Sequence, residues 1–305
     1  MAYSLRDFGS YTVGGHVHHV TTGEPREVQF TRSASYTYDP RGQFCVGQTY
    51  VQYFIPEARR DAPPIVLVHG GGMHGSTWET TPDGRPGWLH LLLDRGYEVH
   101  VVDLVERGRA GFAAGIWPDA PILRSGEEAW TLFRFGSLDR FESRQAFDKQ
   151  QFPVAHFDAF LARMVPRWLS NTALQTAGLI AVLDRLKQAV VICHSQGGEI
   201  TFDAMAQRPG AVAGVLAVEP SGLPEGTLDF ALSILGGDYL DSAEHWTERA
   251  KKWAATAEAI ARKGGVARYI DTAAEIAPGG SHMLMMDAHN AACLEAGLAG
   301  LNLPT

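Results

Sequence analysis

A serine on a predicted strand-to-helix turn is the residue best suited to covalent chemistry in this sequence. Ser195 follows the apolar run 189–193 and lies in Cys193-His-Ser-Gln-Gly197, which is close to the pattern Gly-x-Ser-x-Gly. Small residues two before and two after the serine permit the strained backbone that lifts its hydroxyl above a sheet. The next amide, that of Gln196, would begin a helix, where it can stabilise an oxyanion. A passive serine in a glycine-rich turn is the alternative.

A glycine run provides a second candidate for oxyanion binding. His69-Gly-Gly-Gly72 comes directly after the apolar run 65–68. Without Cβ atoms, such a loop can turn its backbone amides toward a ligand. In serine hydrolases a loop at this place supplies the other oxyanion donor. We therefore expect Gly71 to be that donor, with Gly72 as the neighbouring alternative, whereas a flexible turn is the plainer interpretation.

A serine hydroxyl becomes a strong nucleophile only when a base removes its proton. In the chain order that accompanies a Gly-x-Ser-x-Gly turn, the base follows the serine. Three histidines do so: His245, His282 and His289. The first and last fall in predicted helices, whereas His282 lies in the glycine-rich loop 278–283. A loop at the carboxyl end of a sheet is where the base must lie, so we predict His282 rather than a histidine on a helix.

The carboxylate that would orient this base has two candidates. Glu219 ends the apolar run 212–218, and Pro220 then stops the strand. A carboxylate at a buried strand end is costly unless it is paired, so a histidine partner would explain it. Asp238 follows a weaker predicted strand and offers a competing position, although a turn or cap role suits it better. Residue type and spacing do not decide between Glu219 and Asp238.

The elements that would position these residues alternate between strands and helices. Short, continuously apolar runs are typical of strands buried on both faces of a parallel sheet, and helical stretches lie between them. This alternation predicts an α/β fold, within a single domain of residues 1–305. The predicted buried strands are 65–68, 99–104, 189–193 and 212–218, with a weaker one at 230–235 and antiparallel ones at 27–31 and 47–55; the helices are 87–95, 172–187, 199–207, 243–263 and 288–298.

Residues 105–165 interrupt this rhythm with many aromatic and charged residues and little strand signal. We interpret this segment as a cap-like insertion over the sheet, which implies a covered pocket for a small or medium substrate. Its aromatic stripe (Trp130, Phe133 and Phe135) could line that pocket, but core packing is at least as good an interpretation. Arg107-Gly-Arg109, just after the predicted strand 99–104, is either an anion site or a loop shaped near the active site.

Composition excludes several classes of function. The 305 residues carry 26 Lys+Arg and 34 Asp+Glu, so the formal net charge is 26 − 34 = −8. A negative chain without a run of five basic residues predicts no nucleic-acid partner and no basic membrane-binding patch. Since no stretch of 18 apolar residues occurs and no signal peptide is recognisable, we predict a cytoplasmic protein that does not enter a membrane.

Nothing in the sequence calls for a metal or another cofactor. The three cysteines (Cys45, Cys193 and Cys293) have no CxxC spacing and are too few for a disulfide framework. Cys193 is better interpreted as a small packing residue than as a nucleophile. His16 and His18 share one face of a predicted strand, but no third ligand accompanies them.

Together these motifs resemble the α/β-hydrolases, and among them a small group of bacterial carboxylesterases. Beyond the two motifs at 69–72 and 194–197, the resemblance rests on Thr-Trp-Glu-Thr-Thr-Pro-Asp-Gly-Arg-Pro-Gly-Trp at 77–88, Val-Glu-Pro at 218–220 and Gly-Ser-His-Met at 280–283. It covers much of 65–220 and 278–290. In that group the acid is a glutamate after the sixth strand, which implies Glu219. A relative in the group carries two cysteines where this chain has Gly71 and Gly72, and the glycine pair is closer to the lipase-type loop.

The resemblance implies a serine hydrolase that cleaves a small-molecule carboxylic ester or lactone. Ser195 would be the nucleophile, His282 the base and Glu219 the acid, with Gly71 and Gln196 as oxyanion donors. Two alternatives stay open: a carbon–carbon bond hydrolase or acyltransferase with the same residues, and a non-catalytic binding module. Hydrolases of this type often pair, so a homodimer is a further expectation.

Overall fold

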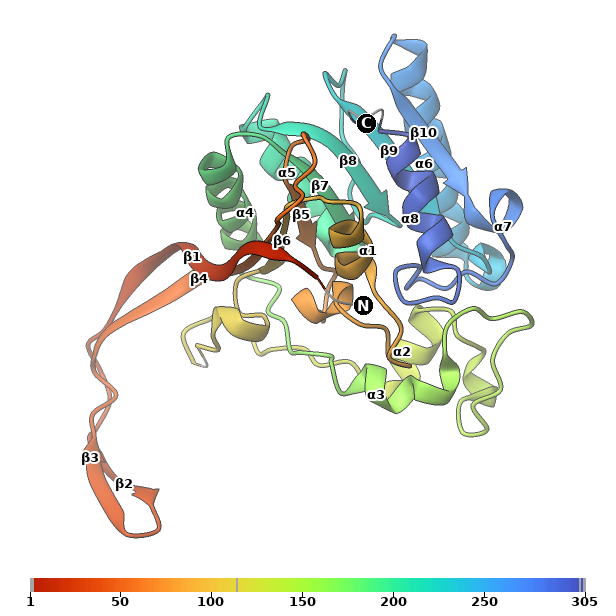
Figure 1. Ribbon diagram of the computed structural model, residues 1–305. Helices are drawn as coiled ribbons and strands as arrows, with labels where there is room; N and C mark the ends of the chain where they lie inside the picture. The colour runs from red at the N-terminus through yellow and green to blue at the C-terminus, as the bar shows by residue number, and fades with distance from the viewer. Residues whose placement is uncertain (1–2, 114, 302, 304–305) are drawn as a thin grey trace.

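A central sheet of eight strands organises the protein (Figure 1). The computed structural model describes residues 3–113, 115–301 and 303. The strand order is β1-β4-β6-β5-β7-β8-β9-β10, in which β6 to β10 run parallel and β1 and β4 pair antiparallel at one edge. The strands are β1 (Leu5–Val20), β4 (Gly42–Pro56), β5 (Ile65–Val68), β6 (Val99–Asp103), β7 (Ala189–His194), β8 (Val212–Val218), β9 (Ala231–Gly236) and β10 (Ala267–Asp271). This arrangement confirms the predicted α/β fold.

Helices cover both faces of the sheet, and the alternation of side chains along each strand explains how. Ile65 and Leu67 of β5 pack in one apolar cluster with residues of α1 and α8, whereas Val66 and Val68 pack in a second cluster with α4, α5 and α6. Both faces of β5 are therefore buried among apolar side chains. The helices are α1 (Trp88–Asp94), α2 (Gly126–Leu132), α3 (Phe157–Leu161), α4 (Thr172–Leu186), α5 (Gln196–Gln207), α6 (Glu244–Arg262), α7 (Thr272–Glu275) and α8 (Asn290–Ala299).

The segment between β6 and α4 contains the predicted insertion. It holds α2, α3 and short 3-10 turns, which lie along one end of the sheet (Figure 1). Trp130, Phe133 and Phe135 are buried in the same apolar cluster as Ile65 and Leu67. The aromatic stripe is therefore part of the main core, as the packing interpretation expects.

Two features of the fold go beyond the predicted elements, although β2 (Arg26–Thr31) and part of β4 coincide with the antiparallel strands predicted at 27–31 and 47–55. The hairpin of β1 and β4 continues into β2 and β3 (Ala34–Tyr38), which form an arm that extends well beyond the sheet (Figure 1). The edge strand β10 is only partly buried and carries Arg268 and Asp271, so it lacks the apolar run that marks the central strands. Among the helices that the structure describes, none is long and apolar enough to cross a membrane.

Candidate active site

Ser195 lies on the turn that joins β7 to α5. Its backbone has φ 50° and ψ −119°, a conformation that L residues rarely adopt and that is typical of strained functional turns. A Cβ atom on Gly197 would lie 2.7 Å from the carbonyl oxygen of His69 and 2.9 Å from that of Val68. Since both neighbours are backbone atoms, the turn tolerates only glycine there, as the motif predicts.

The glycine loop after β5 lies against this turn. A Cβ atom on Gly70 would lie 3.1 Å from Cβ of Ser195, and one on Gly71 would lie 2.9 Å from Oε1 of Gln196. No described residue accepts a hydrogen bond from the backbone amide of Gly71 or of Gln196. Both amides therefore remain available to a ligand oxygen near Ser195.

His282 and Glu219 are in direct contact, although they are far apart in the chain. His282 Nδ1 lies 2.5 Å from Oε2 of Glu219, and both side chains are buried. The loop that carries the histidine is held by two backbone bonds: His282 N donates to the Phe133 carbonyl at 3.0 Å, and the His282 carbonyl accepts from Nε2 of His194 at 3.0 Å. The ring of Phe133 stacks on that of His282 with centroids 5.6 Å apart. These contacts fix the ring with Nδ1 toward the carboxylate.

Asp238, the competing acid, has a different role. Its carboxylate accepts hydrogen bonds from the amides of Gly279 and Tyr239, each at 2.7 Å, and so shapes the loop that leads to His282. The ring of His245 instead packs at a tilt against that of Trp246, with centroids 5.1 Å apart. Neither ring nitrogen of His289 hydrogen-bonds to a described residue. Of the candidate bases and acids, the structure brings together only His282 and Glu219.

The backbone of Ser195 is hydrogen-bonded to the residues that flank Glu219 and Pro220. Its amide donates to the carbonyl of Val218, the residue before Glu219, at 3.0 Å, and its carbonyl accepts from the Ser221 amide at 2.9 Å. Within the described residues, Ser195 Oγ and His282 Nε2 form no hydrogen bond, either with each other or elsewhere. Catalytic hydrogen bonds are often long without substrate and shorten when it binds. The geometry thus pairs His282 with Glu219 and places Ser195 on the adjoining turn.

Arg134 is a site residue that the sequence analysis missed. Its guanidinium donates to both oxygens of Glu219, to Oε2 at 2.9 Å, and its Nε donates to the Asp238 carbonyl at 2.8 Å. Both members of this ion pair are fully buried. The guanidinium also lies 4.4 Å from the ring centroid of Trp246. No sequence signal marks it, since Arg134 is a lone cation between two phenylalanines in a segment without regular strands.

These charges determine the protonation of the pair. Burial alone would raise the pKa of Glu219, but the charges of Arg134 and His282 and their hydrogen bonds lower it well below its usual range. Burial lowers the pKa of His282; Glu219 opposes this, and Arg134 adds to it. The carboxylate is therefore ionised and the imidazole neutral at pH 7, which is the state that a general base requires.

In the part of the chain that it describes, the structure gives no support to a cysteine nucleophile or a metal site. Burial raises the pKa of the Cys193 thiol to about 12, so it is no nucleophile at neutral pH. Among the described residues, His, Cys, Asp and Glu form no group of three or more that could hold a metal ion.

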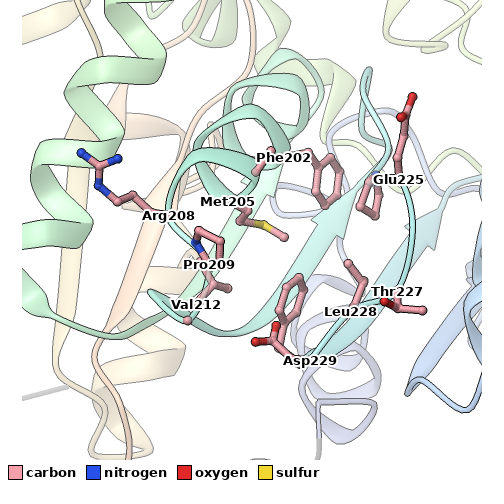
Figure 2. A pocket seen from close by; sticks show the side chains of 13 residues that line it. Phe202, Met205, Arg208, Pro209, Val212, Glu225, Thr227, Leu228 and Asp229 are labelled. Carbon is pink, nitrogen blue, oxygen red and sulfur yellow. The ribbon is translucent and has the colours of Figure 1, made fainter.

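The cavity drawn in Figure 2 is separate from these residues. It measures about 210 Å³ and is lined by the C-terminal end of α5, including Met205, by Arg208 just after the helix, and by residues 224–225 and 227–230. Ser195 precedes the opposite end of that 12-residue helix, which is roughly 18 Å long. The Figure 2 cavity therefore takes no part in the site around Ser195.

Comparison with known proteins agrees with this fold. The family model described as "Alpha/beta hydrolase family" matches residues 65–263, so the chain belongs to the α/β-hydrolase family. A solved bacterial esterase is 30% identical and has a TM-score of 0.86, with 98% of this chain and 96% of the esterase covered. A curated relative, "Probable secreted lipase phiG" from Fungal sp. (strain ATCC 74256), is 33% identical over 217 residues.

The alignment with the fungal relative covers 68% of this chain but only 54% of that protein, about half its length. The chain is thus a member of the α/β-hydrolase family, and proteins similar to it are named esterase and lipase. Because the fungal relative is named as secreted, the cytoplasmic location stays a prediction.

Proposed function

We propose that the protein is a serine hydrolase that cleaves a carboxylic ester or lactone through a covalent acyl-enzyme. The observation that carries this proposal is the buried contact between His282 and Glu219 on the rim where Ser195 occupies its strained turn. A buried carboxylate on one imidazole nitrogen leaves the other nitrogen to act as a base toward a neighbouring hydroxyl. The esterase and lipase names of the relatives agree with this chemistry.

The acylation step uses the five predicted residues. His282 Nε2 takes the proton of Ser195 as Oγ bonds to the ester carbonyl carbon. The amides of Gly71 and Gln196 donate to the oxyanion that forms, and such a donor is typically worth about 3–4 kcal/mol of barrier. When the intermediate collapses, the bond to the alcohol oxygen breaks and His282 returns the proton to that oxygen. Glu219 keeps its hydrogen bond to Nδ1 throughout and stabilises the charged imidazole.

Deacylation repeats these roles with water. His282 removes a proton from a water molecule as the water oxygen bonds to the acyl carbon. Collapse breaks the bond to Ser195 Oγ, which takes the proton back from His282. The free acid leaves and the enzyme returns to its starting state.

A Ser195→Ala variant tests the proposal. Alanine bears the same backbone strain as serine, so we expect the thermal unfolding midpoint to stay close to that of the wild type. Turnover of a chromogenic short-chain ester should fall at least about 10³-fold, since the nucleophile is lost. Ser143→Ala is a matched control, because Ser143 is exposed and bonds only the carbonyl of Arg140.

Two outcomes would contradict this function. One is wild-type turnover by folded Ser195→Ala; the other is failure of a fluorophosphonate to label Ser195 in the wild type. A panel of esters, lactones and β-diketones, with and without an alcohol acceptor, separates hydrolysis of the proposed bonds from carbon–carbon cleavage and acyl transfer.

A further inference from the structure

Arg107 is a buried cation without a partner. Its side chain has 0% exposure, and none of its three guanidinium nitrogens hydrogen-bonds to a described residue. Leaving a charged group both dehydrated and unpaired costs several kcal/mol, and native structures rarely do so without a reason. Burial, together with the charge of Arg167, lowers the pKa of Arg107 to about 9, so the side chain is still a cation at neutral pH.

The adjacent arginine provides a direct contrast. Arg109, two residues on, donates from Nε to Asp103 at 2.7 Å and lies 4.6 Å from the ring centroid of Tyr50. The neighbouring carboxylate of Glu106 is also occupied, because it accepts from the amide of Ala113 at 2.5 Å. The two acids near this loop are thus engaged elsewhere, and Arg107 is left without a counter-ion.

Arg167 brings a second guanidinium to the oxyanion loop. Its Nη1 donates to Oε1 of Gln196 at 3.1 Å, and a Cβ atom on Gly71 would lie 2.5 Å from that nitrogen. Its Nε is buried and has no partner among the described residues. The two oxyanion donors of the proposed mechanism therefore lie directly beside Arg167.

Arg107 approaches the same loop from the end of β6. The amide of Leu104, three residues earlier, donates to Nε2 of His69 at 3.1 Å, and His69 immediately precedes the glycines. Burial and then the charge of Arg107 lower the pKa of His69 to about 3. The segment after Arg107 also packs on the one after Arg167, where the rings of Phe112 and Trp168 have centroids 5.0 Å apart. Two arginines with unused donors thus converge on the oxyanion loop.

We propose that Arg107 and Arg167 bind a carboxylate of the substrate, so that the enzyme prefers an ester or lactone that carries a free carboxylate close to the scissile bond. A planar guanidinium matches a carboxylate through paired N–H···O bonds, which makes arginine the usual residue for such recognition. One negative charge suffices to neutralise the fully buried Arg107, while Arg167 retains its bond to Gln196. This inference rests on the proposed esterase function, whose nucleophile it uses.

The test compares two substrates that differ in charge and by one methyl group: 4-nitrophenyl hydrogen glutarate and its neutral methyl ester. We expect the wild type to have at least a tenfold higher kcat/KM for the anionic substrate. Arg107→Met should reduce this ratio at least tenfold, and Arg107→Lys should recover part of it. Arg109→Met is the matched control and should keep the wild-type ratio, since Arg109 is already paired with Asp103.

A binding measurement covers the case in which Arg107→Met does not fold. Ser195→Ala should show a rise in unfolding temperature with millimolar glutarate but not with 1,5-pentanediol, since only the anion can pair with Arg107. Stabilisation by inorganic phosphate alone, or no stabilisation by glutarate, would overturn the carboxylate site.

The kinetic outcomes separate this inference from the proposed function. Equal kcat/KM values for the two esters, with Ser195 labelled by a fluorophosphonate, would refute the carboxylate site and leave the hydrolase intact. No turnover of either ester, together with no labelling, would refute the hydrolase itself.

Discussion

Replacing Arg134 by methionine separates the charge of this residue from its bulk. Methionine is unbranched and fills a similar apolar volume beside Trp246, but it donates nothing to Glu219. Glu219 would keep its bonds to His282 and to the Gly237 amide and lose both bonds from the guanidinium. The variant thus leaves a fully buried carboxylate without its cation.

The substitution should have two effects, one on stability and one on the pKa of His282. Removing one partner of a buried ion pair typically costs about 3–5 kcal/mol, which at roughly 2 °C per kcal/mol lowers the unfolding midpoint by about 6–10 °C. The second effect is on His282. Arg134 is one of the causes that lower the pKa of this imidazole, so its removal raises that pKa. The acid limb of the kcat/KM profile should therefore move to higher pH, because His282 retains its proton longer as pH rises.

The assay is a pH profile of ester hydrolysis between pH 4 and 9, combined with thermal unfolding. Arg249→Met is the matched control, since Arg249 also lies over Trp246, at 5.1 Å, but makes no bond to Glu219. It should lower the midpoint much less and move the acid limb only slightly, in the same direction. An acid limb in Arg134→Met that stays in place or moves to lower pH would refute the electrostatic argument.

Two further substitutions test other parts of the site. Asp287 accepts bonds from the amide and hydroxyl of Ser281, each at 2.7 Å, and burial raises its pKa to about 7. Between about pH 4 and 7 the folded protein then holds a proton that the unfolded chain releases, so stability falls as pH rises through this window. Asp287→Asn should reduce this dependence of the unfolding midpoint on pH. An unchanged dependence would contradict the raised pKa of Asp287. Gly197→Ala should lower the free energy of unfolding by about 1–3 kcal/mol, because the added Cβ would meet two backbone carbonyls. Gly214→Ala should lower it much less, since the nearest atom to its Cβ lies at 3.6 Å. Equal unfolding midpoints for the two variants would mean that the turn at Ser195 is not tight.

Local physics explains which parts of the fold could be predicted. The central strands are apolar on both faces, so their runs are visible in the sequence, and β5 and β8 have the predicted bounds. The helix α5 begins at Gln196, as the predicted turn at Ser195 implies, and not at 199, where the helical pattern of the sequence starts. The pattern starts late because Gly197 and Gly198 are poor helix formers that tight packing nevertheless requires at this turn. The edge strands have no such run, and β10 was missed for this reason.

Some residues of the candidate site could likewise be predicted from the sequence, and others could not. Ser195, His282 and Glu219 lie at ends of strands or in a glycine-rich loop, where chain order and the family resemblance restrict the choices. Arg134 contacts Glu219 across 85 residues of sequence, from a segment with no regular period. Such a contact exists only after folding, and a single arginine in the sequence gives no sign of it. The same holds for Arg107, whose lack of a partner is a property of its surroundings.

The segment between β6 and α4 contributes a charge to the site. The ionised Glu219 on Nδ1 raises the pKa of His282, which stabilises the charged imidazole beside the oxyanion intermediate but lowers the fraction of neutral imidazole available as a base near neutral pH. Arg134, supplied by the insertion, offsets that tendency and keeps the carboxylate ionised in a place where burial disfavours it. Loss of this cation would raise the pKa of Glu219, while His282 and the Gly237 amide would still favour its ionised form. Arg134 thus links the segment between β6 and α4 to the protonation of Glu219 and His282 at the sheet edge.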